Sequence, residues 1–452
     1  MNSKAFSTQT ASIIVFGLLF FTYASIHQLG EANQNTRLDL LHALVERGEW
    51  TIDAYHENTV DVSIVNGHYY SPKAPATILL SMPAFLVSRS ILSIAGISIE
   101  SPRGWWLSDW MTTAFSVGLL TALGGAALFL FLVRFVSRSA ALVTTLALFL
   151  GAAPLPYATC LFAHSETVGL LCIALWLLEC RCTSAWSSAL AGLSAGLAAA
   201  GEFTAAPAAI GLFCWSLAKG RRAGGWFLLG SLPALLLIPA YNWIVFGGPF
   251  IFGYLHLPAS FGIMHHQGFF GITFPPSPLK IAYLLLSPAR GLFFWTPFLL
   301  LIIEGYRDLW RLLPRSHFLI TVLVPIVQIT LIGGFIALGG WALGPRYLSS
   351  MLPFLALPAA LGWRRFPRLG TALAILSVLF TGLGTIVTAT PSLEYTNPLL
   401  QLYIPRFLEG NLTPTIFSEL GMHGIVSVLP IVLVVGGGVA VLWRGWAIRS
   451  QH

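Results

Sequence analysis

The stretch SDWMTTAFSVGLLTALGGAALFLFLV, residues 108–133, decides the class of fold, because its 26 residues include a single charged side chain, Asp109. A helix needs about 20 mostly apolar residues to cross a bilayer, so this run alone predicts a membrane span. Eleven further apolar runs could cross in the same way, and they lie near 11–29, 139–159, 165–179, 184–200, 203–218, 224–246, 291–304, 317–339, 347–362, 370–390 and 424–443.

The composition of the whole chain agrees with this interpretation. Of the 452 residues, 56% are hydrophobic and 9% are charged, whereas a soluble domain carries roughly 25% charged residues. This difference excludes a soluble globular enzyme, a disordered protein and a nucleic-acid-binding protein. The sequence therefore predicts an all-α polytopic membrane protein, with residues 1–452 forming a single transmembrane domain.

The distribution of positive charge predicts the orientation of the chain. A thirteenth apolar run, 76–98, contains Pro83 and Arg89, and if it does not span, the basic clusters all fall on one side. That side holds 15 basic and 3 acidic residues, and the other side holds 9 basic and 14 acidic residues. Because positive charge stays on the cytoplasmic side during insertion, we expect twelve spans, cytoplasmic termini and a place in the inner (plasma) membrane. Run 76–98 should then form a re-entrant or surface-lying pair of short helices.

Three long segments lie on the outer side in this topology, namely 30–107, 247–290 and 391–423. In the first, Thr36 and Asp39 resemble a capping box, and apolar residues recur at helical spacing as far as Gly48. This pattern predicts an amphipathic helix on the membrane surface. Alternating residues on both sides of Asn66-Gly67 predict a small β-hairpin.

The outer segments carry most of the ionisable residues, which predicts a polar cavity at the membrane surface. These residues are Asp39, Asp53, Asp61, Glu166, Glu202, Glu394, Lys73, Arg290, Arg346, His68, His164, His265 and His266. Carboxylates and histidines suit acid–base chemistry, and the cations suit anion binding. Arg290 and Arg346 each precede an apolar run on the less basic side, which favours a role in anion binding. An ion channel would need matched rings of like residues instead.

Several of these residues also have a simpler structural explanation, which the sequence leaves open. Asp61 could lie on a solvated hairpin, Glu202 could lie at the membrane interface, and segment 164–166 could cap a helix N-terminus. His265-His266 is a weak metal motif, and no other spacing of histidine or cysteine indicates a metal site.

In their order and spacing the segments resemble the C-type (GT-C) membrane glycosyltransferases, in particular the bacterial branch of protein O-mannosyltransferases and lipid A aminoarabinose transferases. The resemblance runs through about the whole chain, from a first span and a long outer loop onward. The motifs that carry it are Asn35-Thr36-Arg37-Leu38, Glu46–Asp53, Gly67–Pro75, Tyr241-Asn242-Trp243, Phe246–Phe250, Ser287–Phe293 and Gly344–Leu348.

The resemblance implies a GT-C-like fold and transfer of a sugar from a polyprenyl-phosphate donor to a lipid, glycan or protein acceptor on the outer face. In better-known relatives an acid directly precedes the Thr-Arg pair and serves as base or positions the acceptor, but this chain has Asn35 there. The base is therefore unassigned. Asp53 is slightly preferred, followed by Asp61, and Glu31, Asp39 and Glu202 come behind them.

The implied chemistry explains why these residue types occur together. Displacing a lipid phosphate from an anomeric carbon needs a base for the incoming hydroxyl and cations for the departing phosphate. Attack opposite the phosphate would invert the anomeric centre. Lys73, Arg290 and Arg346 are the candidate phosphate ligands. The candidate substrate contacts are His68, Tyr69, Tyr70, His164, Glu166, Glu202 and His265. No cofactor is expected with certainty; a divalent metal could assist, although the spacing identifies no ligand set.

Two other functions remain compatible with the sequence. The first is a transporter or flippase of a lipid-linked or anionic substrate, whose signature would be inverted repeats with paired broken helices; we find no such symmetry. The second is an inactive relative that assists another membrane enzyme, which the amide at Asn35 keeps open.

Overall fold

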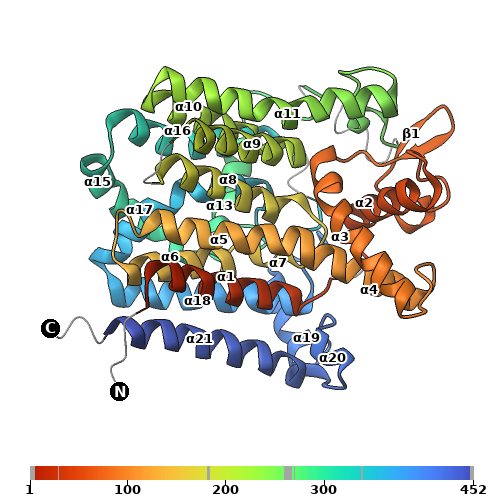
Figure 1. Ribbon diagram of the computed structural model, residues 1–452. Helices are drawn as coiled ribbons and strands as arrows, with labels where there is room; N and C mark the ends of the chain where they lie inside the picture. Colours follow the sequence, from red (N-terminus) through yellow and green to blue (C-terminus); the bar gives the residue numbers. More distant parts are fainter. Residues whose placement is uncertain are drawn as a thin grey trace.

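The predicted apolar runs fold into helices that lie side by side along one direction (Figure 1). The structure is a computed structural model that describes residues 6–28, 30–180, 184–258, 267–268, 270–336 and 340–447. Within these ranges the only sheet is a pair of short strands. The all-α polytopic fold expected from the sequence is therefore confirmed.

The bundle consists of twelve helices among the described residues: α1 (Thr8–Ala24), α5 (Leu119–Leu132), α6 (Arg138–Leu150), α8 (Ala163–Glu179), α9 (Ala185–Gly201), α10 (Ala206–Lys219), α11 (Arg221–Phe246), α15 (Ile302–Leu312), α16 (Arg315–Gly334), α17 (Leu352–Arg365), α18 (Pro367–Val387) and α21 (Leu429–Ala447). Shorter helices connect them: α7 (Pro154–Ala158), α13 (Pro278–Leu286), α14 (Leu292–Trp295), α19 (Ile404–Leu408) and α20 (Ile416–Glu419). Single 3-10 or π turns occur at Ala43–Arg47, His56–Asn58, Ala114–Gly118, Phe203–Ala205, Gly253–His256, Pro297–Leu301, Arg346–Met351, Leu399–Tyr403 and Gly424–Val428.

The number of membrane spans is a separate question from the number of helices. Among the described residues, six helices are long and apolar enough to cross a membrane: Pro75–Ile94, Pro102–Leu132, Arg221–Phe246, Arg315–Gly334, Pro367–Val387 and Gly424–Trp443. Thr8–Ala24, Arg138–Leu150 and Phe203–Lys219 are apolar but shorter. The count of twelve spans therefore stays a prediction.

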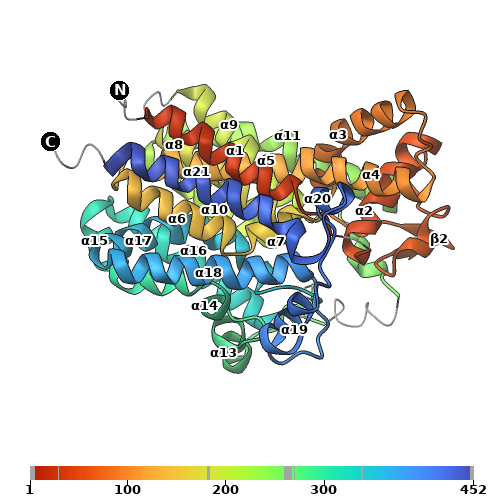
Figure 2. The same cartoon turned by 90° about the horizontal axis from the view of Figure 1, so that it is seen from below.

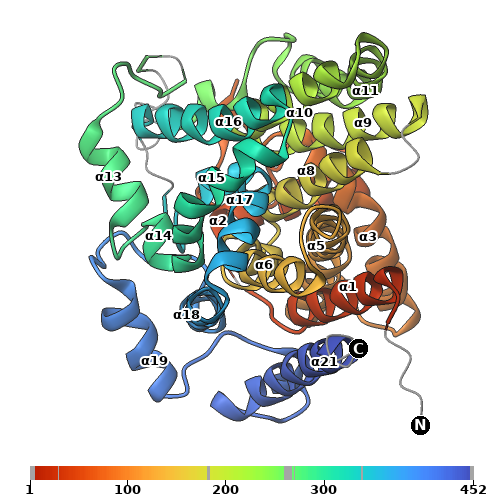
Figure 3. The same cartoon turned by 90° about the vertical axis from the view of Figure 1, so that its left-hand side faces the viewer.

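The hydrophobic core lies along the axis of the bundle. Viewed along that axis, α6 and α17 lie near the centre, while α11 and α21 lie at the periphery (Figure 3). Almost every side chain of α17 is buried, whereas α21 exposes large apolar residues such as Leu433. An apolar exterior of this kind is what a bilayer covers.

Helices α5 and α8 pack unusually closely, because two glycines face each other where they cross. A Cβ atom placed on Gly124 would lie 2.1 Å from the Cα atom of Gly169. No larger side chain fits at such a crossing, as in other close helix contacts within membranes. The contact fixes the position of α8, whose first turn carries His164 and Glu166.

A helix forms in the predicted segment, but it starts earlier than predicted and is mostly buried, and its place on the membrane surface stays a prediction. Helix α2 (Ala32–His42) begins four residues before Thr36, its N-cap residue is Glu31, and no side chain caps it, so the predicted capping box is wrong. Thr36 is instead buried inside the helix. The π turn that follows ends at Gly48, as expected, with a φ of 68°.

The predicted hairpin is confirmed. Strand β1 (Ser63–Val65) pairs antiparallel with β2 (His68–Tyr70). Asn66 and Gly67 have φ values of 52° and 83°. Positive φ at both central residues is the requirement of the type I′ turn that joins strands through two residues.

Run 76–98 does not form a pair of short helices, so this part of the prediction is wrong. It forms one helix, α3 (Pro75–Ile94), with Pro83 inside it, and α4 (Pro102–Thr113) follows. In Figures 1 and 2, α2, α3, α4 and the hairpin gather at one end of the bundle, and the start of α1, the end of α21 and α15 lie at the opposite end.

Candidate functional site

A cluster of ionisable residues lies where segment 30–107 meets the bundle. We call it the outer cluster; its members are Arg37, Asp61, Lys73, His164, Glu166, Glu202, Tyr254 and Arg346. Arg37, on α2, is 2% exposed and interacts electrostatically with Asp61, Glu166 and Glu202. Its Nη1 donates a hydrogen bond to the carbonyl oxygen of Asn33 at 2.7 Å. Residues that are far apart in the sequence therefore meet at one arginine.

Lys73 and Asp61 form an ion pair within this cluster. The Lys73 Nζ atom lies 2.5 Å from Asp61 Oδ2, and the side chains are 5% and 20% exposed. The ammonium also lies over the Tyr254 ring, 5.3 Å from its centroid. Burial lowers the pKa of Lys73, and the neighbouring Asp61 carboxylate opposes that change. This lysine is thus held away from water with one anionic partner.

Glu202 and His164 form a second pair. The Glu202 Oε2 atom lies 3.3 Å from His164 Nδ1. The other carboxylate oxygen accepts a hydrogen bond from the Thr204 hydroxyl at 3.0 Å. Glu202 follows the last residue of α9, so the end of that helix orients the carboxylate.

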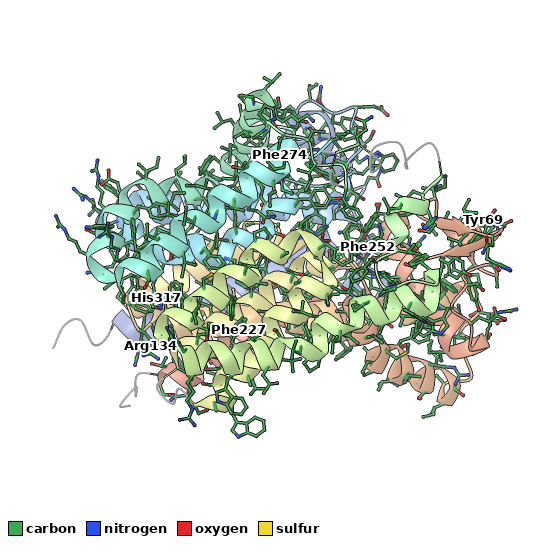
Figure 4. The ribbon with its side chains drawn as sticks, turned by 90° about the horizontal axis from the view of Figure 1, so that it is seen from above. Tyr69, Arg134, Phe227, Phe252, Phe274 and His317 are labelled. Carbon is green, nitrogen blue, oxygen red and sulfur yellow. The ribbon has the colours of Figure 1, made fainter. Side chains whose placement is uncertain are left out.

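Both members of this second pair line a cavity of about 820 Å³. Its walls are apolar and come mainly from α10, α11 and α16, with residues such as Ile210, Ile238 and Val327. Polar residues line it as well: Asn33, Arg37, His164, Glu202, Thr204, Tyr254, Gln328 and Tyr347. Phe252, which also lines the cavity, lies between the bundle and the hairpin that carries Tyr69, whereas Arg134 and His317 lie at the far end (Figure 4).

Glu166 is buried beside this cavity and holds α8 against α3. One of its carboxylate oxygens accepts a short hydrogen bond from the Thr77 hydroxyl. The other is buried and has no hydrogen-bond partner among the described residues. A Cβ atom on Gly201 would lie 3.2 Å from Thr77 Oγ1 and 3.3 Å from Glu166 Oε1. The glycine therefore leaves space for this contact directly before Glu202.

Arg346 and Arg290 are buried near each other, on another side of the cluster. Arg346 is 8% exposed, and its guanidinium carbon lies 5.5 Å and 5.2 Å from the ring centroids of Phe162 and Tyr347. Its Nε atom has no hydrogen-bond partner among the described residues. Arg290 is 3% exposed and interacts electrostatically with Arg346 and Tyr157.

Asp53 lies outside the cluster. Its carboxylate accepts hydrogen bonds from the Tyr69 backbone N–H at 2.6 Å and pairs with the His68 ring at 2.7 Å. Burial raises the pKa of Asp53, but these two partners outweigh burial and hold the pKa below its usual range. The side chains of Asp53 and His68 are 37% and 58% exposed. This geometry fits a clamp on the hairpin. Tyr70, on the same hairpin, contacts Phe246 at the end of α11.

Asp39 is also separate from the cavity lining. It is fully buried in α2, and one carboxylate oxygen accepts a hydrogen bond from Asn58 Nδ2 at 3.1 Å. Asn35, at the position of the acid expected from the resemblance, donates to the Asn58 carbonyl oxygen and does not line the cavity. His265 and His266 lie outside the described residues, so nothing is concluded about them.

Sequence reasoning does not identify several members of the site. Tyr254, Thr77 and Gln328 are absent from the predicted set, and Arg37 and Tyr347 enter it only as parts of motifs. Gln328 has a usable signal, since a polar side chain within the apolar run 317–339 is a functional candidate by default. The other residues give no local signal, because chain segments distant in sequence bring them together.

The described residues contain no group of three or more histidine, cysteine or acidic side chains arranged to hold a metal ion. The carboxylates of Asp61 and Glu202 are each paired with a basic side chain. The described part of the site therefore does not fit a metal, and we derive no step through one.

Comparison with known proteins identifies the fold. The structure is similar to ArnT from Cupriavidus metallidurans in the apo state, with a TM-score of 0.52 and 15% identity, covering 97% of this chain and 76% of ArnT. ArnT bound to undecaprenyl phosphate (TM-score 0.48, 15% identity, 97% and 75% coverage) and the Archaeoglobus fulgidus oligosaccharyltransferase AglB, in complex with an inhibitory peptide and a dolichol-phosphate (0.45, 14%, 85% and 56%), also match. The sequence matches no family model and no curated protein.

The similarity to apo ArnT shows that this chain has the same fold as ArnT. The chain is a multi-pass membrane protein with this fold.

Proposed function

We propose that this chain is a membrane glycosyltransferase that moves a sugar from a polyprenyl-phosphate donor to an acceptor on the outer face of the inner membrane, with inversion. The shared fold with ArnT makes this reaction class the first to consider. The observation that supports it best is an apolar cavity of about 820 Å³ that also has Arg37, His164 and Glu202 in its lining. A lipid tail, a phosphate and a sugar each find matching chemistry there.

In this proposal the isoprenoid chain of the donor occupies the apolar walls and its phosphate meets the cations of the outer cluster. Arg37 lines the cavity, and Lys73 and Arg346 belong to the same electrostatic cluster. A guanidinium can bind two phosphate oxygens at once, which suits Arg37 and Arg346. Arg290 acts together with Arg346, since the two interact.

Glu202 is the base that we assign, in place of the sequence-based preference for Asp53. Glu202 lines the cavity, whereas Asp53 forms an exposed pair with His68. The acceptor hydroxyl oxygen forms a bond to the anomeric carbon, and its proton passes to a Glu202 oxygen. The bond from that carbon to the phosphate oxygen breaks, and polyprenyl phosphate leaves with the electron pair.

Asp61 has a different part in this scheme. Its carboxylate neutralises Lys73 at 2.5 Å while the donor is absent. A bound phosphate competes for the same ammonium, so the pair opens when the donor arrives. Lys73 thereby remains charged in a buried place, because it always has an anion beside it.

The test is transfer of radiolabelled sugar by the purified protein in detergent or nanodiscs. Synthetic polyprenyl phosphates carrying mannose, glucose or 4-amino-4-deoxyarabinose are the donors, and lipid, glycan and peptide acceptors are offered in parallel. We expect labelled product with one donor, and a loss of about 10²–10⁴-fold in rate for Glu202→Gln. Donor binding without any transfer, together with movement of the donor across vesicle membranes, would support a transporter instead.

A further inference from the structure

Gln328 is a buried amide on α16 that has one unused hydrogen-bond acceptor. Its side chain is 1% exposed and lines the cavity. The Nε2 atom donates to two backbone carbonyl oxygens, those of Thr204 at 2.9 Å and Tyr347 at 2.7 Å. The Oε1 atom is buried and has no hydrogen-bond partner among the described residues.

The orientation of this amide follows from its partners. Oxygen and nitrogen of an amide look alike in most structures, so their assignment must come from the hydrogen-bond network. Here both partners are carbonyl oxygens, which only accept, so the NH₂ group of Gln328 has to face them. Its carbonyl oxygen is consequently fixed in the remaining direction.

A buried acceptor in a fixed position is expected to have a hydrogen-bond donor beside it. Nearly all buried polar atoms in proteins have a hydrogen-bond partner, and an exception needs a specific reason. A polar residue within an apolar helix is a functional candidate as well. Support of the loop accounts for the NH₂ group, through Thr204 and Tyr347, and leaves the oxygen to be explained.

The two anchoring residues locate Gln328 within the reaction. Thr204 donates its hydroxyl to Glu202, the proposed base, and Tyr347 directly follows Arg346, a proposed phosphate ligand. The amide therefore lies between the segment that takes the proton and the segment that holds the phosphate. In a polyprenyl-phosphate sugar, the sugar ring is what lies between these two positions.

We propose that Gln328 Oε1 accepts a hydrogen bond from a hydroxyl group of the donor's sugar, which makes Gln328 a specificity-determining residue. This inference rests on the proposed function and adds the recognition of one sugar hydroxyl to it. A site built to bind a hydroxyl discriminates against an analogue that lacks it, because the buried acceptor is then left without a partner.

The experiment measures donor binding, so that it does not depend on turnover. The probes are mannosyl, glucosyl and 4-amino-4-deoxyarabinosyl phosphates of one polyprenol, and, for the tightest binder, the set of its monodeoxy analogues. We expect one monodeoxy analogue to bind wild-type protein on the order of tenfold more weakly, the usual size for one neutral hydrogen bond. Gln328→Met, which has similar length but no comparable acceptor, should bind that analogue and the parent donor equally.

The ratio between parent and analogue separates recognition from support of the fold. Gln328→Met also loses the hydrogen bonds to the carbonyl oxygens of Thr204 and Tyr347. The loss of these two bonds should weaken binding of the parent donor and of its analogues by the same factor, so by itself it does not change the ratio between them. Ile326→Met, which changes the exposed face of the same helix outside the cavity lining, is the matched control and should keep the wild-type ratio.

Three results would overturn the inference. If wild-type protein binds every monodeoxy analogue as tightly as the parent, or if Gln328→Met keeps the discrimination, Gln328 does not read a hydroxyl. Either result leaves the proposed function standing. If no sugar-bearing donor binds at all, the inference and the proposed function fail together.

Discussion

Replacing Asp39 by asparagine should stabilise the protein at alkaline pH, and the structure indicates by how much. Asp39 is fully buried in α2, with one carboxylate oxygen bonded to Asn58 and the other without a hydrogen-bond partner among the described residues. Burial raises its pKa to about 7, although the Asn58 hydrogen bond opposes this. An ionised carboxylate is therefore costly at this position.

The direction in which stability changes with pH follows from the number of protons bound in the folded and unfolded states. In the unfolded chain the carboxyl loses its proton near its ordinary pKa of about 3.9, while the folded protein keeps it up to about 7. Between these values the folded state binds more protons, so stability falls as pH rises and is lowest above about 7. A difference of roughly 3 pKa units corresponds to a penalty of about 4 kcal/mol.

Asparagine removes this penalty but adds a smaller one. Its amide oxygen can still accept from Asn58, whereas its NH₂ group replaces the unpartnered oxygen and costs about 1–3 kcal/mol. Asp39→Asn should thus gain roughly 1–3 kcal/mol near pH 8 and lose this advantage as the pH falls towards 5. Thermal unfolding in detergent across this pH range measures the effect.

Asp53→Asn is the matched control, because it makes the same chemical change where the carboxylate is stabilised. Its pKa is lowered in the folded protein, so its ionised form contributes stability above the unfolded pKa and loses that contribution as pH falls through the folded value. This variant should be less stable than wild type at neutral pH. If Asp39→Asn were also less stable at pH 8, the reasoning on burial would be refuted. A transfer rate lowered by 10²-fold or more in Asp39→Asn would return that residue to the list of bases.

Three further outcomes are expected. Glu202→Gln should lower the transfer rate by about 10²–10⁴-fold with donor binding nearly intact, whereas Asp53→Asn should keep most of the activity; the reverse pattern, measured as rate and donor affinity, would restore Asp53 as base. Arg346→Lys should weaken donor binding on the order of tenfold although the charge is kept, and unchanged affinity would remove this residue from the phosphate site. Single cysteines at Tyr55 and Gly220, treated with an impermeant thiol reagent on intact cells, should react at position 55 alone; reaction at position 220 would contradict the predicted orientation.

The sequence is sufficient for the class of fold, because that class depends on the amount and arrangement of apolar residues. Residues 108–132 of the run 108–133 belong to one continuous apolar helix, Pro102–Leu132. The Asn66-Gly67 hairpin can also be predicted from the sequence, because its turn needs two consecutive residues that tolerate positive φ, and Asn66 and Gly67 are such residues.

The start of α2 and the role of Asp53 cannot be read in the same way. Thr36 followed by Asp39 has the pattern of a cap, but tertiary burial extends the helix to Ala32 and places both residues inside it. The sequence-based preference for Asp53 rests on its place in the chain, shortly after the predicted surface helix and close to the expected membrane plane. Its actual partners, His68 and the Tyr69 N–H, lie on strand β2, 15 and 16 residues further along the chain, and no local rule assigns that contact.

The candidate site is predictable in kind but not in membership. Lys73, Arg346, His164 and Glu202 are candidates because each is an ionisable residue on the predicted outer side of an apolar chain. Which of them share a cavity depends on how α2, α8, α9 and α16 pack against one another. That arrangement depends on contacts such as the one between α5 and α8, which the sequence shows only as scattered glycines.

The crossing of α5 and α8 at Gly124 and Gly169 has a consequence for the evolution of the sequence. Backbone touches backbone there, since a Cβ atom on Gly124 would come within 2.1 Å of the Gly169 Cα atom, so neither side has a side chain left to shrink. A larger residue at one position cannot be compensated by a smaller one at the other. Either glycine can therefore be replaced only if the two helices move apart, and that movement would displace His164 and Glu166, which lie on α8. Descendants of this protein that keep its chemistry are expected to inherit both glycines unchanged, while the loops around them are free to diversify.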